Sequence, residues 1–543
     1  MPYAPFNVAT WNILQSAISW SPTTRTPRIT NMPNTTFNPK TRRILFVGLD
    51  CATYWIVEKL VAEGRMPNLA HLMENGVTFH TETEEPVVSP VVWTSIASAK
   101  SPEKHGVKSF NASSNSVRTK RIWDVFLEQG SSVGIMGHFV TWPPAKVNGF
   151  MIPDLLALDE QTYPEELSFL RKLTEANKGG KQQNAVELLT YTLRALKYGA
   201  RLSTLGAAML EMLRKKVSQR PMIEAQFEVR VLKQRLYSDI FVRLCRWYQP
   251  QYAYFHNHLI DTSSHIFWKY LEPEKFGDVS EEDVQKYGDS LFKAYEHADA
   301  TLGKIARLAD SGTLIVVASD HGAKAAVEQA MQWRIPTIKS EALMQSLGIE
   351  QEVSYSNVGF DILVKPRVES ESGKEQLKSL FESITIVEDE VPLFRIKEHD
   401  STNLWLSLNN AIAEVKDRHI SVRDQKFELQ HFVHASNDRT SGVHDGKNAI
   451  LVLSGKGVKK NVKFKQKAQV LDIVPTILAL TGLPVGRDMD GQVLTEAIED
   501  AFSEKHPVEY IESYDEPDTG SEAQADMESS EALKSQLRAL GYL

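Results

Sequence analysis

Seven side chains of this sequence have the chemistry of a metal-assisted phosphoryl-transfer site. Carboxylates and imidazoles are common ligands of divalent metal ions, and a serine hydroxyl becomes a nucleophile when a base or a metal ion activates it. The combination indicates two metal ions around one nucleophile, which names a reaction type rather than only a fold. The seven residues are Asp50, Ser89, Asp261, His265, Asp320, His321 and His444.

Three of the candidate ligands stand where buried strands are expected to end. Asp50 closes the apolar run RRILFVGLD, and Asp320 with His321 closes TLIVVASDH. Ligands of open α/β sheets gather at the carboxyl edge of the strands, so these two strands can bring three ligands to one place. The structural alternative for a strand-end aspartate is a helix N-cap, and it would be favoured for one such residue alone. For Asp320-His321-Gly322 together we favour the functional interpretation.

Asp261 and His265 are four residues apart, directly after the predicted strand QYAYFHNHL. If a helix begins near Leu259, both side chains lie on one helix face and can bind one ion. His256 and His258 are an alternative ligand pair, because alternate residues of a strand share a face. Strand histidines beside aromatic residues are more often packed and hydrogen-bonded than metal-bound. We therefore favour the helical pair, while His258 is placed to line the site.

Ser89 lies in EEPVVSPVVWTSIASAKSPEKHG, immediately before Pro90. Because proline favours the first helical position, Ser89 is predicted to be the N-cap of a helix that runs through Ser98. N-capping is the structural alternative to catalysis here. The same position also directs backbone N–H groups and the positive end of the helix at an anion bound to the serine, so the two roles are compatible.

His444 lies in RTSGVHDGKNAILVLSG, a glycine-flanked loop that leads into a predicted strand. A single loop histidine is usually a surface residue. Its assignment as a metal ligand therefore depends on the other six residues.

Alternating strand-like and helix-like segments predict an α/β fold with a mainly parallel central sheet flanked by helices. Short continuous apolar runs predict buried strands. The segment 53–76 has the apolar spacing of a helix that ends at Gly76. The predicted strands are 42–50, 132–139, 251–259, 313–320 and 449–455.

Two insertions are predicted to interrupt this core. Residues 156–245 are strongly helical in pattern, and we favour a helical cap packed on itself or on the sheet over contact with a membrane. Residues 324–438 mix short strands and helices and predict a mixed α/β lid. The full predicted division is an irregular extension at 1–40, a first segment of the catalytic core at 41–155, the helical insertion at 156–245, a second core segment at 246–323, the lid at 324–438, a third core segment at 439–500, and an acidic, flexible tail ending in a helix at 501–543.

The bulk composition limits the possible partners. The 543 residues are 42% hydrophobic and 24% charged, which is typical of a globular chain with a large core. A net charge of −8 disfavours binding to nucleic-acid polymers. Because Cys51 and Cys245 are the only cysteines, a disulfide framework and a thiolate zinc site are excluded. Carboxylates and imidazoles must therefore hold any metal ion.

The sequence contains no obvious membrane or export segment. No stretch approaches the ~20 consecutive apolar residues that span a bilayer. The first Lys or Arg is Arg25, and the amino terminus lacks the basic and apolar regions of a signal peptide. We therefore expect a cytoplasmic enzyme that acts on a small molecule. The oligomeric state is not predicted.

Several motifs together resemble the alkaline phosphatase superfamily, specifically its type I phosphodiesterase/nucleotide pyrophosphatase family. They occur in the family's order and cover about 42–155, 250–325 and 440–495. The resemblance implies an alkaline phosphatase-like fold and a phosphoric ester hydrolase of the phosphodiesterase or phosphatase type. The matching motifs are ILFVGLD, SPVVWTSIASAKSPEKHGV, DTSSH, VASDHG, SGVHDG and VLDIVPTILALTGLPVGRDMDG.

The resemblance also implies roles for the seven residues. Ser89 would attack phosphorus and carry a phosphoserine intermediate. Zinc is the usual ion of the family, and manganese is possible in oxygen-richer relatives. Two divalent ions are implied, the first bound by Asp261, His265 and His444 and the second by Asp50, Asp320 and His321.

This sequence departs from the family's pattern at three places. Val92 stands where nucleotide pyrophosphatases have an asparagine that contacts phosphate, and Ser89 replaces their usual threonine nucleophile. Both differences weaken the assignment as a nucleotide pyrophosphatase proper. The usual Thr-Gly further along is Ser98-Ala99, which affects only a turn. A sulfatase is disfavoured, because Ser89 is not followed by the x-Pro-x-Arg pattern that builds formylglycine.

The substrate is expected to be recognised by the insertions and by the segment GHFVTWPPAKVNGFMIPD. In that segment His138, Thr141 and Trp142 follow a strand and are candidates for contacting the leaving group, while the structural alternative is a rigid turn with a packed indole. Two other functions stay open. One is a phosphotransferase, phosphomonoesterase or mutase on the same scaffold. The other is a catalytically silent binding protein, although this sequence lacks none of the expected ligands.

Overall fold

The structure is a computed structural model that describes most of the chain. It covers residues 42–83, 87–174, 185–217, 221–276, 279–326, 337–358, 361–368, 370–398, 404–409, 418–422, 425–434 and 441–515. The predicted extension at 1–40 and the helix predicted at the end of the tail lie outside these described residues.

A nine-stranded sheet forms the centre of the fold. Its strand order is β20-β2-β19-β6-β1-β5-β3-β4, and β21 also pairs with β2. Within the described sheet, β19 runs antiparallel to β2 and β6, and the other pairings are parallel. The predicted α/β class with a mainly parallel sheet is therefore confirmed. The strands are β1 (Ile44–Leu49), β2 (Gly76–Glu82), β3 (Val133–Met136), β4 (Gly149–Ile152), β5 (Tyr252–Asn257), β6 (Leu314–Ala318), β19 (Ala449–Ser454), β20 (Val462–Lys463) and β21 (Ala468–Gln469).

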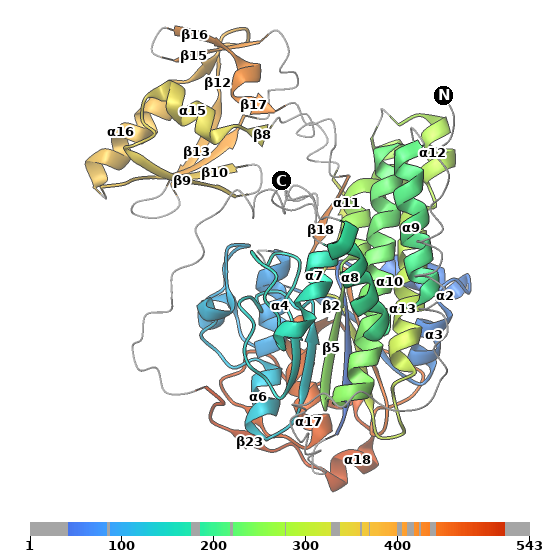
Figure 1. The fold of residues 1–543 in the computed structure, drawn as a ribbon. Helices are drawn as coiled ribbons and strands as arrows, with labels where there is room; N and C mark the ends of the chain where they lie inside the picture. The colour runs from blue at the N-terminus through green and yellow to red at the C-terminus, as the bar shows by residue number, and fades with distance from the viewer. Residues whose placement is uncertain are drawn as a thin grey trace, which may run out of the picture.

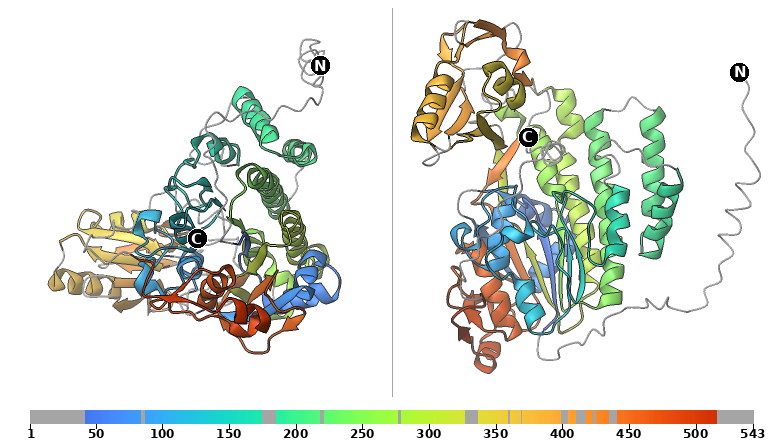
Figure 2. Two further views of the ribbon diagram at one scale, coloured as in Figure 1. Left: turned by 90° about the horizontal axis from the view of Figure 1, so that it is seen from below. Right: turned by 60° about the vertical axis from the view of Figure 1, so that its left-hand side comes forward.

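Helices cover both faces of this sheet (Figures 1 and 2). Alternate residues of a strand point to opposite faces, and β1 shows this clearly. Leu45 and Val47 enter one hydrophobic cluster with α2, α3, α10, α11 and α13, whereas Ile44 and Phe46 enter another with α4, α6 and α17. The helices are α2 (Tyr54–Ala62), α3 (Pro67–Glu74), α4 (Ser89–Ser98), α5 (Pro102–His105), α6 (Ile122–Glu128), α10 (Met222–Tyr248), α11 (Leu259–Leu271), α12 (Glu281–Tyr287), α13 (Ser290–Ala306) and α17 (Ile473–Thr481).

The segment 53–76 forms two helices rather than the single helix predicted. Gly64 adopts a φ of 71°, which glycine tolerates, and Pro67 begins α3 at the position that proline favours. Gly76 begins β2 instead of ending a helix. A Cβ atom at Gly76 would lie 2.1 Å from the carbonyl oxygen of Leu453 on β19, so the glycine allows the two strands to approach.

The helical insertion contains α7 (Ser168–Thr174), α8 (Ala185–Lys197), α9 (Leu202–Val217) and most of α10. Helix α9 packs on α10 partly through polar groups, because the Thr204 hydroxyl donates to Asp239 Oδ2 at 2.8 Å. Leu202, Met209 and Leu213 of α9 are exposed. None of the described helices combines the length and the apolar character that crossing a bilayer requires.

A second unit with its own hydrophobic core lies within the predicted lid, coloured yellow to orange in Figure 1. It contains two antiparallel four-stranded sheets, β13-β14-β10-β9 and β12-β11-β15-β16. The chain enters and leaves through two antiparallel pairs, β7 with β18 and β8 with β17. The elements are β7 (Gly322–Ala325), β8 (Thr337–Ile338), α15 (Ser340–Leu347), β9 (Val353–Val358), β10 (Asp361–Pro366), α16 (Glu371–Glu382), β11 (Thr385–Ile386), β12 (Val391–Pro392), β13 (Phe394–Glu398), β14 (Leu404–Leu408), β15 (His419–Val422), β16 (Gln425–Glu428), β17 (Val433–His434) and β18 (Gly442–Asp445).

Regular structure continues beyond residue 500, where the flexible tail was predicted to begin. Helix α18 (Asp500–Lys505) is followed by β23 (Tyr510–Ile511), which pairs in parallel with β22 (Val485–Gly486). The buried ammonium of Lys100 also lies 2.5 Å from Asp515 Oδ2. The beginning of the predicted tail is therefore attached to the core.

Candidate metal centre

The carboxyl ends of two neighbouring strands carry Asp50, Asp320 and His321. Strands β1 and β6 are parallel neighbours in which Gly48 pairs with Ala318, so the residues that follow leave the sheet at the same edge. All three side chains are fully buried. A ligand atom of each lies within 4.8 Å of the others. The three residues predicted to meet at this edge therefore do so.

Ser89 is the first residue of α4, and the prediction that it is the N-cap is wrong. Val88 occupies the N-cap position with an extended backbone. Ser89 Oγ instead lies 3.1 Å from His321 Nε2. The N–H groups of Val91 and Val92 both donate to the carbonyl oxygen of Val88. The hydroxyl is thus directed at the predicted ligands rather than at its own helix.

Asp261, His265 and His444 form the other end of the centre. Helix α11 begins at Leu259 as predicted, and its spacing brings His265 Nε2 within 3.3 Å of Asp261 Oδ1. His444 comes from β18, where it pairs with Ala323 of β7. Its Nε2 also lies 3.3 Å from Asp261 Oδ1. The pairing of β18 with β7 therefore brings His444, which is distant in sequence, into the site.

Three of these histidines direct the same ring nitrogen into the centre. A carbonyl oxygen only accepts hydrogen bonds, so a neutral ring that bonds one through Nδ1 has its hydrogen there and a lone pair on Nε2. Each Nε2 faces a carboxylate oxygen at 3.1 or 3.3 Å. The Nδ1 atoms of His265, His321 and His444 donate to the backbone oxygens of Gly442 (2.8 Å), Gly322 (2.9 Å) and Val87 (2.9 Å), respectively.

The buried charges strongly shift the titration of the site. Burial raises the pKa of the Asp320 carboxyl, and the nearby Asp50 raises it further. Burial alone would lower the pKa of His321, but the Asp320 carboxylate holds it well above its usual value. Burial alone would raise the pKa of Asp261, yet His265 and His444 hold it well below its usual range. The carboxylates therefore attract positive charge strongly.

The donor atoms fit divalent metal ions. Asp50 Oδ1 and Asp320 Oδ2 are buried and make no hydrogen bond within the described chain. Buried carboxylate oxygens are costly without a cation or a donor, and mixed carboxylate and imidazole donors suit zinc or manganese. The donor atoms of Asp261, His321 and His444 also lie within 4.8 Å of one another. His321 therefore lies between the two predicted ligand sets.

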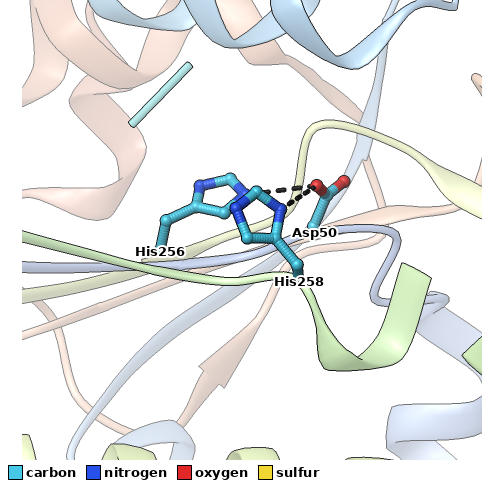
Figure 3. A group of neighbouring side chains, drawn as sticks. All are labelled: Asp50, His256 and His258. Carbon is cyan, nitrogen blue, oxygen red and sulfur yellow. Dashed lines mark hydrogen bonds and ion pairs between the residues drawn. The ribbon is translucent and has the colours of Figure 1, made fainter. Parts of the chain in front are cut away.

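Two further histidines contact Asp50, although sequence reasoning favoured packed positions for both. His256 Nε2 and His258 Nδ1 lie 3.1 and 3.2 Å from the same oxygen, Asp50 Oδ2 (Figure 3). Strand alternation correctly indicated that these two side chains share a face. It did not reveal their partner, because the partner belongs to the neighbouring strand, 206 and 208 positions away.

The three residues predicted to contact substrate are mostly engaged with the protein itself. His138 and Thr141 are buried, and the Thr141 hydroxyl donates to the carbonyl oxygen of His138 at 2.6 Å. The Trp142 indole donates to Asp159 Oδ1 at 2.8 Å. Trp142 also lines a small cavity together with Pro90, the residue after Ser89. Substrate contact by the three stays a prediction.

Comparisons with known proteins agree with the resemblance seen in the motifs. The profile of a family described as type I phosphodiesterase/nucleotide pyrophosphatase matches residues 44–474, which include all seven candidate residues. A search of curated proteins found no match.

The solved structures that match this chain have low sequence identity to it. Alkaline phosphatase PafA has a TM-score of 0.47 and 12% identity, covering 86% of this chain and 100% of its own. Murine ectonucleotide pyrophosphatase/phosphodiesterase 5 has a TM-score of 0.42 and 11% identity, covering 84% and 100%. Phosphonoacetate hydrolase from Sinorhizobium meliloti 1021, in complex with phosphonoformate, has a TM-score of 0.39 and 14% identity, covering 81% and 95%.

Proposed function

Because the chain belongs to the type I phosphodiesterase/nucleotide pyrophosphatase family, and is thus a phosphoric ester hydrolase, we propose that it works through a phosphoserine on Ser89 with two divalent metal ions. The substrate is a small-molecule phosphate ester. The observation that carries the proposal is that Ser89 Oγ lies 3.1 Å from His321 Nε2, and that His321 lies close both to Asp50 and Asp320 and to Asp261 and His444.

Six residues would hold the ions. Three buried carboxylates carry three negative charges, which two divalent ions would offset. When bound, the ions would lower the pKa of the serine hydroxyl and offset the charge of the transferring phosphoryl group. Zinc suits these donors, and manganese is the alternative. The proposed sets are Asp261, His265 and His444 for one ion and Asp50, Asp320 and His321 for the other.

Ser89 would perform the bond exchange. Its Oγ forms a bond to phosphorus while the bond from phosphorus to the leaving alcohol oxygen breaks, and the alcohol departs with a proton. Water then attacks phosphorus, the bond to Oγ breaks, and the serine hydroxyl is regenerated. For a monoester the net products are the alcohol and inorganic phosphate.

Helix α4 supports this role of Ser89. The helix is buried along its whole length, which limits the movement of its first residue. Because Val91 and Val92 already donate to Val88, the helix contributes the positive end of its dipole rather than free N–H groups at these two positions. That partial charge would stabilise a phosphoryl group on Ser89.

The substrate preference differs from that of a nucleotide pyrophosphatase proper. Val92 is buried in the core, so the phosphate-contacting amide implied for those enzymes has no counterpart at this position. Trp142 lines a small cavity beside Pro90, the residue after Ser89, and is the proposed contact for the leaving group.

An assay of purified protein tests the proposal. Protein stripped by a chelator should be inactive and should recover on addition of zinc or manganese. The substrates are a nitrophenyl phosphate monoester, the matching diester and a nucleotide ester. Loss of metal without loss of turnover would contradict the proposal.

Partition of the product between water and an added alcohol tests the intermediate. Two monoesters with different leaving groups should give the same ratio of alkyl phosphate to inorganic phosphate, because both pass through one phosphoserine. Ratios that depend on the leaving group would contradict it. An alkyl phosphate yield far above that expected from the alcohol concentration would identify the alternative function, a phosphotransferase.

A further inference from the structure

The two oxygens of Asp50 have different surroundings. His256 and His258 both approach Oδ2, at 3.1 and 3.2 Å (Figure 3). Oδ1 lies on the side of the proposed metal ligands, 3.8 Å from His321 Nε2, and makes no hydrogen bond within the described chain. One oxygen is thus engaged by imidazoles, while the other is directed at the metal centre.

The hydrogen bond between Tyr254 and His256 determines which ring nitrogen of His256 carries the hydrogen. Tyr254 Oη lies 2.7 Å from His256 Nδ1. A phenol is protonated at neutral pH and donates, so Nδ1 accepts and the ring hydrogen of a neutral His256 is on Nε2. That N–H then donates to Asp50 Oδ2. The arrangement is the reverse of His265, His321 and His444, whose Nδ1 atoms face carbonyl oxygens and whose Nε2 atoms have the lone pair.

The position of the His256 hydrogen distinguishes two possible roles of Asp50, His256 and His258, which are binding a third metal ion and orienting Asp50. The donor atoms of Asp50, His256 and His258 lie within 4.8 Å of one another, so their spacing alone would allow a cation. A ring nitrogen that carries a hydrogen cannot bind a metal ion, and His256 has its other nitrogen occupied by Tyr254. The hydrogen-bond chain therefore favours orientation of Asp50 over a third metal ion.

The packing of β1 against β5 leaves room for the hydrogen bonds that join Tyr254, His256 and Asp50. Alternate residues of β5 and of the position just after it share one face, and these include Tyr254, His256 and His258. His256 pairs with Gly48 of β1. A Cβ atom at Gly48 would lie 2.5 Å from Tyr254 Oη and 2.8 Å from the Trp93 ring. The absence of a side chain at Gly48 therefore makes room for the contact between the phenol and the imidazole.

We propose that Tyr254 and His256, with His258 as a second contact, are positioning residues that occupy Asp50 Oδ2 and present Oδ1 alone to a metal ion. The inference rests on the proposed two-metal function and adds residues to it. Partners of this kind, which orient a metal ligand without touching the metal, typically contribute 10- to 100-fold in metal affinity or activity.

Zinc retention in substituted proteins tests this inference. The wild type should hold two zinc ions per chain in competition with a chelator. In His256→Ala and Tyr254→Phe, the affinity for one of the two should fall by about 10- to 100-fold. His256→Gln should stay close to the wild type, because the glutamine amide can still donate to Asp50 from about the position of Nε2. Tyr252→Phe is the matched control, since Tyr252 is equally buried on the same strand.

The outcomes separate this inference from the proposed function. Wild-type protein that binds no zinc and cleaves no phosphate ester would overturn both. Two zinc ions and turnover in the wild type, with unchanged affinity in His256→Ala and Tyr254→Phe, would overturn the positioning role alone. Three ions in the wild type, with one lost equally in His256→Ala and His256→Gln, would make His256 a ligand. If His256→Ala fails to fold, Tyr254→Phe, which removes one oxygen atom, decides the question.

Discussion

The orientation of each imidazole ring determines which of its nitrogen atoms can bind a metal ion. His265 and His444 come from α11 and β18, yet their Nε2 atoms lie at the same distance, 3.3 Å, from Asp261 Oδ1. Both histidines hold the pKa of this buried carboxylate well below its usual range, and the three side chains together are the proposed ligands of one ion. Asp261 is therefore the residue whose loss should most affect one of the two ions.

We expect Asp261→Asn to remove one of two bound metal ions and to lower turnover by at least about 100-fold, since loss of a direct ligand should exceed the ~10- to 100-fold typical of outer contacts. The substitution conserves size and removes the charge. Metal content and hydrolysis rate measured on the same sample check it. Asp299→Asn is the control, because Asp299 is also buried but bonds Asn68 and Leu69 in the fold. Retention of both ions in Asp261→Asn would contradict the proposed ligand set.

The sequence predicted which side chains come together better than it predicted their local positions. Asp50 and Asp320 were predicted to lie close together because each follows a strand, and the ends of neighbouring parallel strands meet at one edge of the sheet. That prediction requires no knowledge of side-chain positions. The N-cap prediction for Ser89 was wrong by one residue, since proline is compatible with either of the first helical positions. The partner of His256 was not predictable, because it depends on which strand lies beside β5 and in what register.

Strands β1 and β5 pack closely because Gly48 of β1 has no side chain. The Tyr254 phenol and the His256 ring meet in the space beside Gly48. Sequence pattern alone showed β1 only as an apolar run, so it gave no reason to expect that this glycine is needed for packing near the metal centre.

Gly48→Ala should destabilise the fold by about 1–3 kcal/mol, the usual cost of overpacking, and should weaken retention of one metal ion. Denaturant unfolding of the metal-free protein and zinc competition measure the two effects. Gly206→Ala is the control, because Gly206 lies in α9 with open space around its Cβ position, and it should be neutral or slightly stabilising. Equal stability of Gly48→Ala and the wild type would refute the packing argument.

The contact between α4 and α5 contains a histidine that should make stability depend on pH. His105 is buried and its Nε2 lies 2.9 Å from Ser95 Oγ. Burial lowers the pKa of His105 to about 4, from an ordinary value of 6.5. Between these two values the unfolded chain binds a proton that the folded chain does not. The contribution of neutral His105 is therefore complete above pH 6.5 and is lost as the pH falls toward 4.

At 1.36 kcal/mol per pKa unit, this loss amounts to about 2 kcal/mol between pH 7 and pH 5. His105→Gln, which does not titrate, should show a correspondingly smaller decrease in its free energy of unfolding over that range. Chelator-treated protein is used, so that metal binding does not add its own pH dependence. An identical decrease in the wild type and in His105→Gln would contradict the prediction.

The whole molecule combines a layered sheet domain with an inserted unit that has a separate core. Two hydrophobic clusters pack on opposite faces of the central sheet, while the third is built from elements between β8 and β17. The sequence predicted a mixed α/β lid at 324–438, because helical and mixed patterning interrupts the α/β alternation, and the third cluster lies within those residues. The tail predicted from residue 501 contains most of α18 and all of β23, and β23 is too short to give a recognisable strand pattern.

Calorimetry should therefore show two thermal transitions, of which only one responds to metal. Ligands that bind only the folded state stabilise it, by about 2.7 kcal/mol at a free concentration of 100 times Kd. Removing the metal ions should lower the transition of the sheet domain and leave that of the inserted unit unchanged. A single transition, or an equal shift of both, would contradict the independence of the third core.

The Ser89→Ala variant tests whether Ser89 is the nucleophile of a two-metal centre. The variant removes the hydroxyl that lies 3.1 Å from His321 Nε2 and leaves the six proposed ligands in place. Metal content and hydrolysis of a nitrophenyl phosphate ester are measured side by side with the wild type. We predict two bound ions in both proteins and turnover only in the wild type. Turnover by metal-loaded Ser89→Ala at a rate comparable to that of the wild type would show that Ser89 is not the nucleophile.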